Sequence, residues 1–135
     1  MKVDIVVEKG IDKRVEMFSG FGDMFGNSGQ GFSNINLAAV LIEKAISHVY
    51  VVGLTGDCCV RYVRAASYSV TANEDRYTAL DARKAGFETF VLEDVTKCID
   101  AGEKGWGETL KDFEAAGVRV IQSDTEDVMR VGDAP

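Results

Sequence analysis

The most constraining stretch of the sequence is a short run of β-branched and aromatic residues that ends in a turn with two cysteines. Residues 49–52 read VYVV, Gly53 follows, and the turn then brings in Cys58 and Cys59 before a segment that reads as helix. An apolar run between turn residues is typical of a strand buried on both faces of a parallel sheet. A thiol at the strand-to-helix junction lies where helix N–H groups favour the thiolate, but a small buried apolar role is the more frequent one for cysteine.

The rest of the chain alternates between predicted strands and predicted helices. We predict strands at 3–7, 49–52, 88–92 and 118–122, and helices at 34–47, 78–85 and 102–116, with Asn34 capping the first helix. This alternation favours an α/β fold with a parallel sheet and helices on both faces. We interpret residues 1–124 as one domain and residues 125–135 as an acidic tail.

The composition excludes several classes of protein. The formal net charge of −7 argues against a broad surface for nucleic acid or anionic membranes. No apolar run is long enough to span a bilayer, and no secretory signal is visible. An odd number of cysteines, 3 in all, gives no disulfide framework and fits a reducing compartment. We therefore expect a cytoplasmic protein with a small-molecule partner.

Lys9 follows the first predicted strand as the cysteine turn follows the second. Carboxyl ends of parallel strands lie at one edge of a sheet, so Lys9 and Cys59 could meet there. An ammonium group near a thiol lowers the pKa of the thiol. The loop at 17–32 holds several phenylalanines, which could either stack on a flat amide or pin the loop to the core. His48 is expected at the solvent edge rather than as a general base.

Three ordered motifs resemble the isochorismatase-like cysteine hydrolases, and their nicotinamidase branch in particular. The motifs are GLTGDCCV at 53–60, TALDARKAGFETFVLED at 78–94 and VVEKGIDKRVEMFSGFGD at 6–23. The resemblance implies a three-layer αβα fold with a Rossmann-like parallel sheet. It makes Cys59 the nucleophile and Lys9 the lysine of a Cys–Asp–Lys triad. It also assigns Phe21 and Cys58 to the substrate site, and the turn with Leu54, Thr55 and Cys59 to the oxyanion and a non-proline cis peptide.

The implied reaction is hydrolysis of a small amide, typically nicotinamide to nicotinate and ammonia, through a thioester. The family's D-x-Q-x-D-F motif with the catalytic aspartate has no match in this sequence, and neither does its D-x-H metal segment. We therefore expect an incomplete sheet of about four strands instead of six. We also expect no ligands in this chain for the zinc-type metal of the family.

The sequence leaves several alternatives open. The segment near 62–77 separates the cysteine turn from the TALDA helix and is either an insertion or a translated intron. The chain could be another isochorismatase-like hydrolase, or inactive in this shortened form. It could also be a non-catalytic remnant that acts by binding or by completing its sheet with another chain. Redox work by Cys58 and Cys59 is disfavoured, because adjacent cysteines close only a strained ring. By analogy with relatives, a homo-oligomer is expected.

Overall fold

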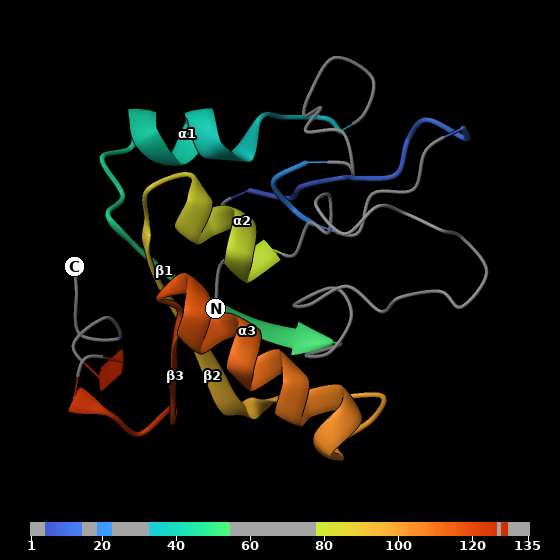
Figure 1. Ribbon diagram of the computed structural model, residues 1–135. Helices are drawn as coiled ribbons and strands as arrows, with labels where there is room; N and C mark the ends of the chain where they lie inside the picture. The colour runs from blue at the N-terminus through green and yellow to red at the C-terminus, as the bar shows by residue number, and fades with distance from the viewer. Residues whose placement is uncertain (1–4, 15–18, 23–32, 55–77, 127, 130–135) are drawn as a thin grey trace.

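A parallel sheet of three strands forms the centre of the computed structural model, which describes residues 5–14, 19–22, 33–54, 78–126 and 128–129 (Figure 1). The strands β1 (His48–Leu54), β2 (Glu88–Lys97) and β3 (Arg119–Ile121) lie in the order β1-β2-β3. Tyr50 of β1 lies opposite Phe90 of β2, and Phe90 lies opposite Arg119 of β3. The predicted α/β class with a parallel sheet is confirmed.

Helices cover one face of this sheet. Helix α3 (Glu108–Ala116) lies in front of the strands in Figure 1, and helix α2 (Thr78–Lys84) contacts α3, β1 and β2. Their buried residues form one core with the strand valines, and this core consists of Val51, Ala79, Val91, Phe113 and Val118. None of the helices in the described ranges is both long and apolar enough to cross a membrane.

Helix α1 (Leu37–Glu43) packs on a second, smaller core. Leu37 and Leu41 contact a cluster of buried residues made of Phe21, Ala82 and Phe87. These leucines are one helical turn apart and therefore share a face of α1. This second core joins α1, the turn at 19–22 and α2, to which it is linked through Ala82.

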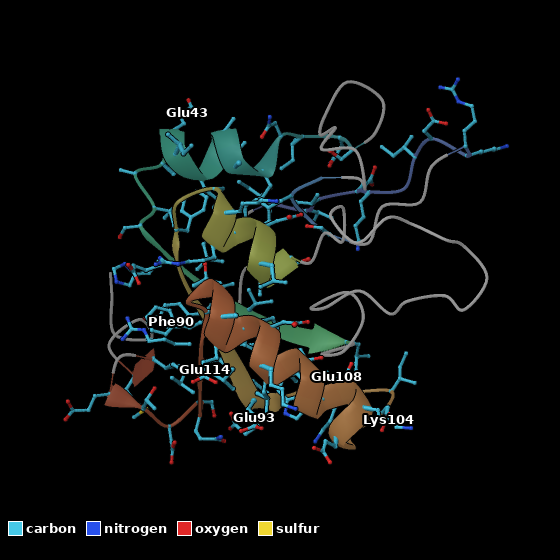
Figure 2. The ribbon with its side chains drawn as sticks, viewed as in Figure 1. Glu43, Phe90, Glu93, Lys104, Glu108 and Glu114 are labelled. Atoms are coloured by element: carbon cyan, nitrogen blue, oxygen red, sulfur yellow. The ribbon has the colours of Figure 1, made fainter. Side chains whose placement is uncertain are left out.

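A row of stacked side chains crosses the opposite face of the sheet. The ring of Tyr50 stacks on that of Phe90 with centroids 4.8 Å apart, and the guanidinium carbon of Arg119 lies 4.4 Å from the Phe90 centroid. Phe90, labelled in Figure 2, is only 2% exposed. The row links all three strands by cross-strand contacts, which stabilise the order of the sheet. A layer of helices on this face stays a prediction.

The first predicted strand is wrong over the part that the structure describes. Ile5, Val6 and Val7 form no regular strand, and only Lys9 pairs, by an isolated antiparallel bridge to Ser33. Residues 33 and 34 are therefore engaged with the amino-terminal segment and do not begin a helix. The cap of α1 is Asn36, whose side chain accepts the Ala39 N–H at 3.1 Å, and not Asn34 as predicted.

Burial of β1 on both faces is also wrong. Val51 is buried, but Val52 is 50% exposed and Leu54 is 74% exposed. The reason is that β1 is an edge strand of the described sheet, and α2 and α3 cover only the face that carries Val51. The alternation of buried and exposed residues along β1 is typical of a strand with one covered face.

Two carboxylates in the second half of β2 bind Trp106 and the chain that follows β3. Glu93, labelled in Figure 2, accepts the indole N–H of Trp106 and the amide of Gln122, each at 2.9 Å. Asp94 accepts the backbone N–H of Ser123 at 2.8 Å and also its hydroxyl. These bonds from Ser123 lower the pKa of Asp94. The segment after β3 is thereby held against the sheet, and beyond it the carbonyl of Thr125 accepts the N–H groups of Val128 and Met129 at 3.1 Å.

We expect Gly117→Ala to destabilise the fold, whereas Gly107→Ala leaves it unchanged or slightly more stable. Gly117 ends α3 with a left-handed φ of +80°, which is unfavourable for an L side chain by about 1–2 kcal/mol. Gly107 has a helical φ of −60°, and a Cβ there meets only ordinary contacts. Urea unfolding followed by circular dichroism measures both variants. Equal losses at the two glycines would contradict this account of the helix end.

Candidate active site

The end of β1 leads directly into the cysteine turn. The pairing with β2 shifts in register between Val51 and Gly53, and Gly53 has a positive φ of 118° that favours glycine. Such irregularities redirect a strand end and are frequent beside active sites. Leu54 then lies opposite Lys97 of β2, at the carboxyl edge of the sheet. Thr55, Cys58 and Cys59 lie outside the described residues, so their roles stay predictions.

The next described residue is Thr78, the first residue of α2. Thr78 binds the turn at residues 19–21, which belongs to another of the motifs. The hydroxyl oxygen of Thr78 accepts the backbone N–H of Gly20 at 3.0 Å. Ser19 is fully buried, and its hydroxyl oxygen accepts the N–H of Phe21 at 3.0 Å. The turn at 19–21 is therefore fixed to the amino-terminal end of α2. Sequence reasoning did not find this contact, because the two residues are far apart along the chain.

Phe21 is a core anchor. Its side chain is 9% exposed, and its ring centroid lies 6.1 Å from that of Phe87. From the sequence, the loop aromatics could either stack on a substrate or anchor the loop in the core. The described contacts of Phe21 are with the core, so Phe21 anchors the loop. A contact between Phe21 and substrate stays a prediction.

Lys9 lies on an exposed part of the amino-terminal segment. Its backbone bridges to Ser33, and the N–H of Asn34 donates to the carbonyl of Glu8 at 3.0 Å. Gly10 follows with a φ of +69°, so the chain turns directly after the lysine. The lysine thus lies between a paired backbone and a turn. The predicted meeting of Lys9 with Cys59 stays a prediction.

The other predicted polar group, His48, lies at the solvent edge as expected. It is exposed at the start of β1, and its Nδ1 lies 2.7 Å from the hydroxyl of Ser47. Its ring is parallel to that of Phe90, with centroids 6.0 Å apart. His48 begins β1, whereas the cysteine turn follows the opposite end of that strand.

Asp12 is the first carboxylate after Lys9 in the described chain. Its side chain forms hydrogen bonds with Arg14. The guanidinium of Arg14 donates to both Asp12 oxygens, at 3.0 and 2.7 Å. These hydrogen bonds lower the pKa of Asp12 to about 2. A carboxylate with so low a pKa is a weak base, so Asp12 is a poor substitute for a catalytic aspartate.

The described residues do not fit a zinc-type metal site. No group of three or more histidine, cysteine, aspartate or glutamate side chains comes together within them. A zinc site needs three or four such ligands around one point. We therefore derive no chemical step through a metal.

Comparison with known proteins identifies relatives of this chain. The family model of the isochorismatase domain matches residues 27–125. The nicotinamidase of Acinetobacter baylyi is 30% identical over an alignment of 122 residues, and the match covers 88% of this chain and 46% of that protein. The chain therefore spans about half the length of the curated relatives that it matches.

Solved structures agree with these sequence relatives. PnC1 from L. infantum in complex with nicotinate superimposes with a TM-score of 0.65 and 29% identity, over 85% of this chain and 46% of that one. The pyrazinamidase of Pyrococcus horikoshii in complex with zinc gives a TM-score of 0.55 and 28% identity, over 79% of this chain and 44% of that one. The ligands in these structures, nicotinate and zinc, belong to those two proteins.

Proposed function

The chain belongs to the isochorismatase domain family. We propose that it acts as an amidohydrolase of the nicotinamidase type, with Cys59 as the nucleophile. The observation that carries the proposal is the family match over β1, α2 and the cysteine motif that lies between them in the sequence. All three lie within residues 27–125, which match the family, and the chain is 30% identical to a nicotinamidase over 122 residues. The proposed substrate is a small aromatic amide, with nicotinamide as the first candidate.

The proposed chemistry forms and breaks one bond at a time. The Cys59 thiolate attacks the amide carbon, and the carbonyl oxygen becomes an oxyanion that accepts N–H groups of the turn from Leu54 to Cys59. Collapse of this intermediate breaks the C–N bond, and the nitrogen leaves as ammonia after it receives a proton. Water then attacks the thioester, which releases the carboxylic acid and regenerates the thiol. Lys9 supplies the positive charge that stabilises the thiolate.

A catalytic carboxylate is the part of the proposal that the sequence does not supply. The family motif that carries the aspartate has no match, and Asp12 is bound to Arg14. Asp57 belongs to the cysteine turn itself, and we assign it no role as a base. A group outside the matched segment would therefore take the thiol proton and give it to the departing nitrogen.

Ammonia release from nicotinamide tests the proposal. We would compare the 135-residue chain with the same chain preceded by the upstream part of the Acinetobacter nicotinamidase, each with and without zinc. We expect release from the extended chain, because it restores the family aspartate. Release from the short chain alone would show that another group replaces the aspartate. If neither protein released ammonia, the proposed substrate would be wrong.

A further inference from the structure

The side chain of Asn34 forms a two-sided clamp on the backbone that leads into Lys9. Its amide oxygen accepts the N–H of Glu8 at 2.8 Å, and its amide nitrogen donates to the carbonyl of Val6 at 2.9 Å. The backbone N–H of Asn34 also donates to the carbonyl of Glu8 at 3.0 Å. Three hydrogen bonds from one residue therefore fix the two residues that surround Val7.

The clamp determines the direction in which the chain reaches Lys9. Both backbone groups of Glu8 are bonded to Asn34, and Lys9 itself bridges to Ser33. Ser33 is 2% exposed, and its hydroxyl donates to the carbonyl of Ile35 at 2.7 Å. The residues that hold the lysine segment are thus anchored in the body of the protein next to α1.

The amide side chain of Asn34 is suited to this clamp. The contact needs an acceptor for Glu8 and a donor for Val6 on the same short side chain, and asparagine carries both. Each bond between such exposed groups adds only about 0.5–1.5 kcal/mol to stability. The bonds are therefore suited to set a geometry rather than to hold the fold together.

We infer that Asn34 is a positioning residue that fixes the backbone from which Lys9 extends. The inference rests on the proposed function, in which the ammonium of Lys9 stabilises the thiolate of Cys59. In this inference Asn34 acts through the backbone of residues 6–9. Loss of its side-chain amide should leave Lys9 present but its backbone no longer fixed, which in the proposed function weakens the stabilisation of the thiolate.

The pH dependence of Cys59 alkylation tests this role without any need for catalysis. In a Cys58→Ala background, iodoacetamide labelling of Cys59 is followed by peptide mass spectrometry over a range of pH. Lys9→Ala should slow labelling at neutral pH by roughly tenfold, because loss of a nearby cation raises the thiol pKa by about one unit or more. Asn34→Leu should slow it by about threefold or more for the same reason, with Asn34→Ala as a second variant if leucine disturbs folding.

Asn36→Leu is the matched control, because it makes the same substitution two residues away. Asn36 caps α1, so its loss lowers stability by about 1 kcal/mol but leaves the clamp intact. We expect its labelling profile to equal that of the Cys58→Ala protein with no further substitution. A general loosening of the region would slow labelling equally in both asparagine variants.

The possible results separate this inference from the proposed function. If Lys9→Ala slows labelling and Asn34→Leu behaves like Asn36→Leu, Asn34 has no positioning role, and the proposed function is unaffected. If Lys9→Ala has no effect, Lys9 is not beside the thiol, and the inference is overturned. If the labelling shifts are as expected but no ammonia is released from nicotinamide, the substrate assignment fails and the role of Asn34 stands.

Discussion

Replacement of Cys59 by alanine is expected to abolish ammonia release, while Cys58→Ala retains it. Removal of the nucleophile prevents the thioester from forming, and losses of this kind reach several orders of magnitude in kcat. Cys58 is the adjacent residue and is assigned to the substrate site, so its loss should act mainly on KM. The measurement is ammonia release as a function of nicotinamide concentration, in the extended chain if the short one is inactive.

Cys98→Ala is a suitable control for this comparison. Cys98 lies after β2, is half-buried and belongs to a different part of the chain from the cysteine turn. Its replacement should leave kcat and KM unchanged. Equal losses in the Cys58 and Cys59 variants would remove the basis for choosing Cys59 as the nucleophile.

Phe113→Ala is expected to give the largest loss of stability in the described core. Phe113 is 0% exposed, and the ring of Trp106 meets it edge-on with centroids 6.2 Å apart. It packs with Val51 and Val91, and so joins α3 to β1 and β2. Truncation of a buried phenylalanine to alanine lowers the free energy of unfolding by about 3–5 kcal/mol. That is a large fraction of the roughly 5–15 kcal/mol available to a typical domain.

Two further variants separate the cavity from other effects of substitution. Phe113→Leu keeps much of the volume and should lose clearly less stability than Phe113→Ala. Ile42→Ala removes an apolar side chain that is 63% exposed on α1, and should change stability by only about 0.5 kcal/mol or less. Urea unfolding by circular dichroism compares the three. A loss at Phe113→Ala no greater than that at Ile42→Ala would mean that this core does not stabilise the fold.

The sequence predicted helix α2 and the end of α3, because helical periodicity and a terminal glycine are visible within a short segment. Residues 78–85 and the stop at Gly86 correspond to α2, and the stop at Gly117 corresponds to the end of α3. Strand β2 was predicted to end at Leu92 but extends to Lys97. Most residues between Leu92 and the end of β2 are polar, yet Thr96 and Lys97 pair with Gly53 and Leu54 beyond the shift in register. That pairing depends on a partner strand and is not visible in either segment alone.

The first turn of the predicted helix at 102–116 shows the same limit. It is a π-helical turn at Glu103–Gly107, in which the N–H of Gly107 donates to the carbonyl of Gly102 at 3.1 Å. The N–H of Trp106 meanwhile donates to the carbonyl of Asp100 at 3.0 Å. The preceding loop thus takes part in the helix start, which helical periodicity does not reveal.

Some residues of the candidate site could be predicted from the sequence, and others could not. Motif resemblance pointed to Lys9, Phe21 and the cysteine turn, because these residues carry a recognisable order along the chain. It did not point to Asn34, which is read as a helix cap from its neighbours but instead binds residues 6–8. An asparagine before an apolar periodic run predicts a cap equally well at 34 and at 36. Only the long-range pairing with Val6 and Glu8 distinguishes the two positions.

The place of the single tryptophan gives this fold an intrinsic optical reporter. Trp106 is the one tryptophan in the sequence, it is half-buried, and its indole N–H is bound to Glu93 while its ring touches Phe113. Its fluorescence therefore reports on the junction of the π-helical turn, β2 and α3. Separation of that junction would expose the indole to water and shift its emission to longer wavelength. The integrity of this half of the molecule can thus be followed in the same sample while the cysteine turn is labelled or supplied with substrate.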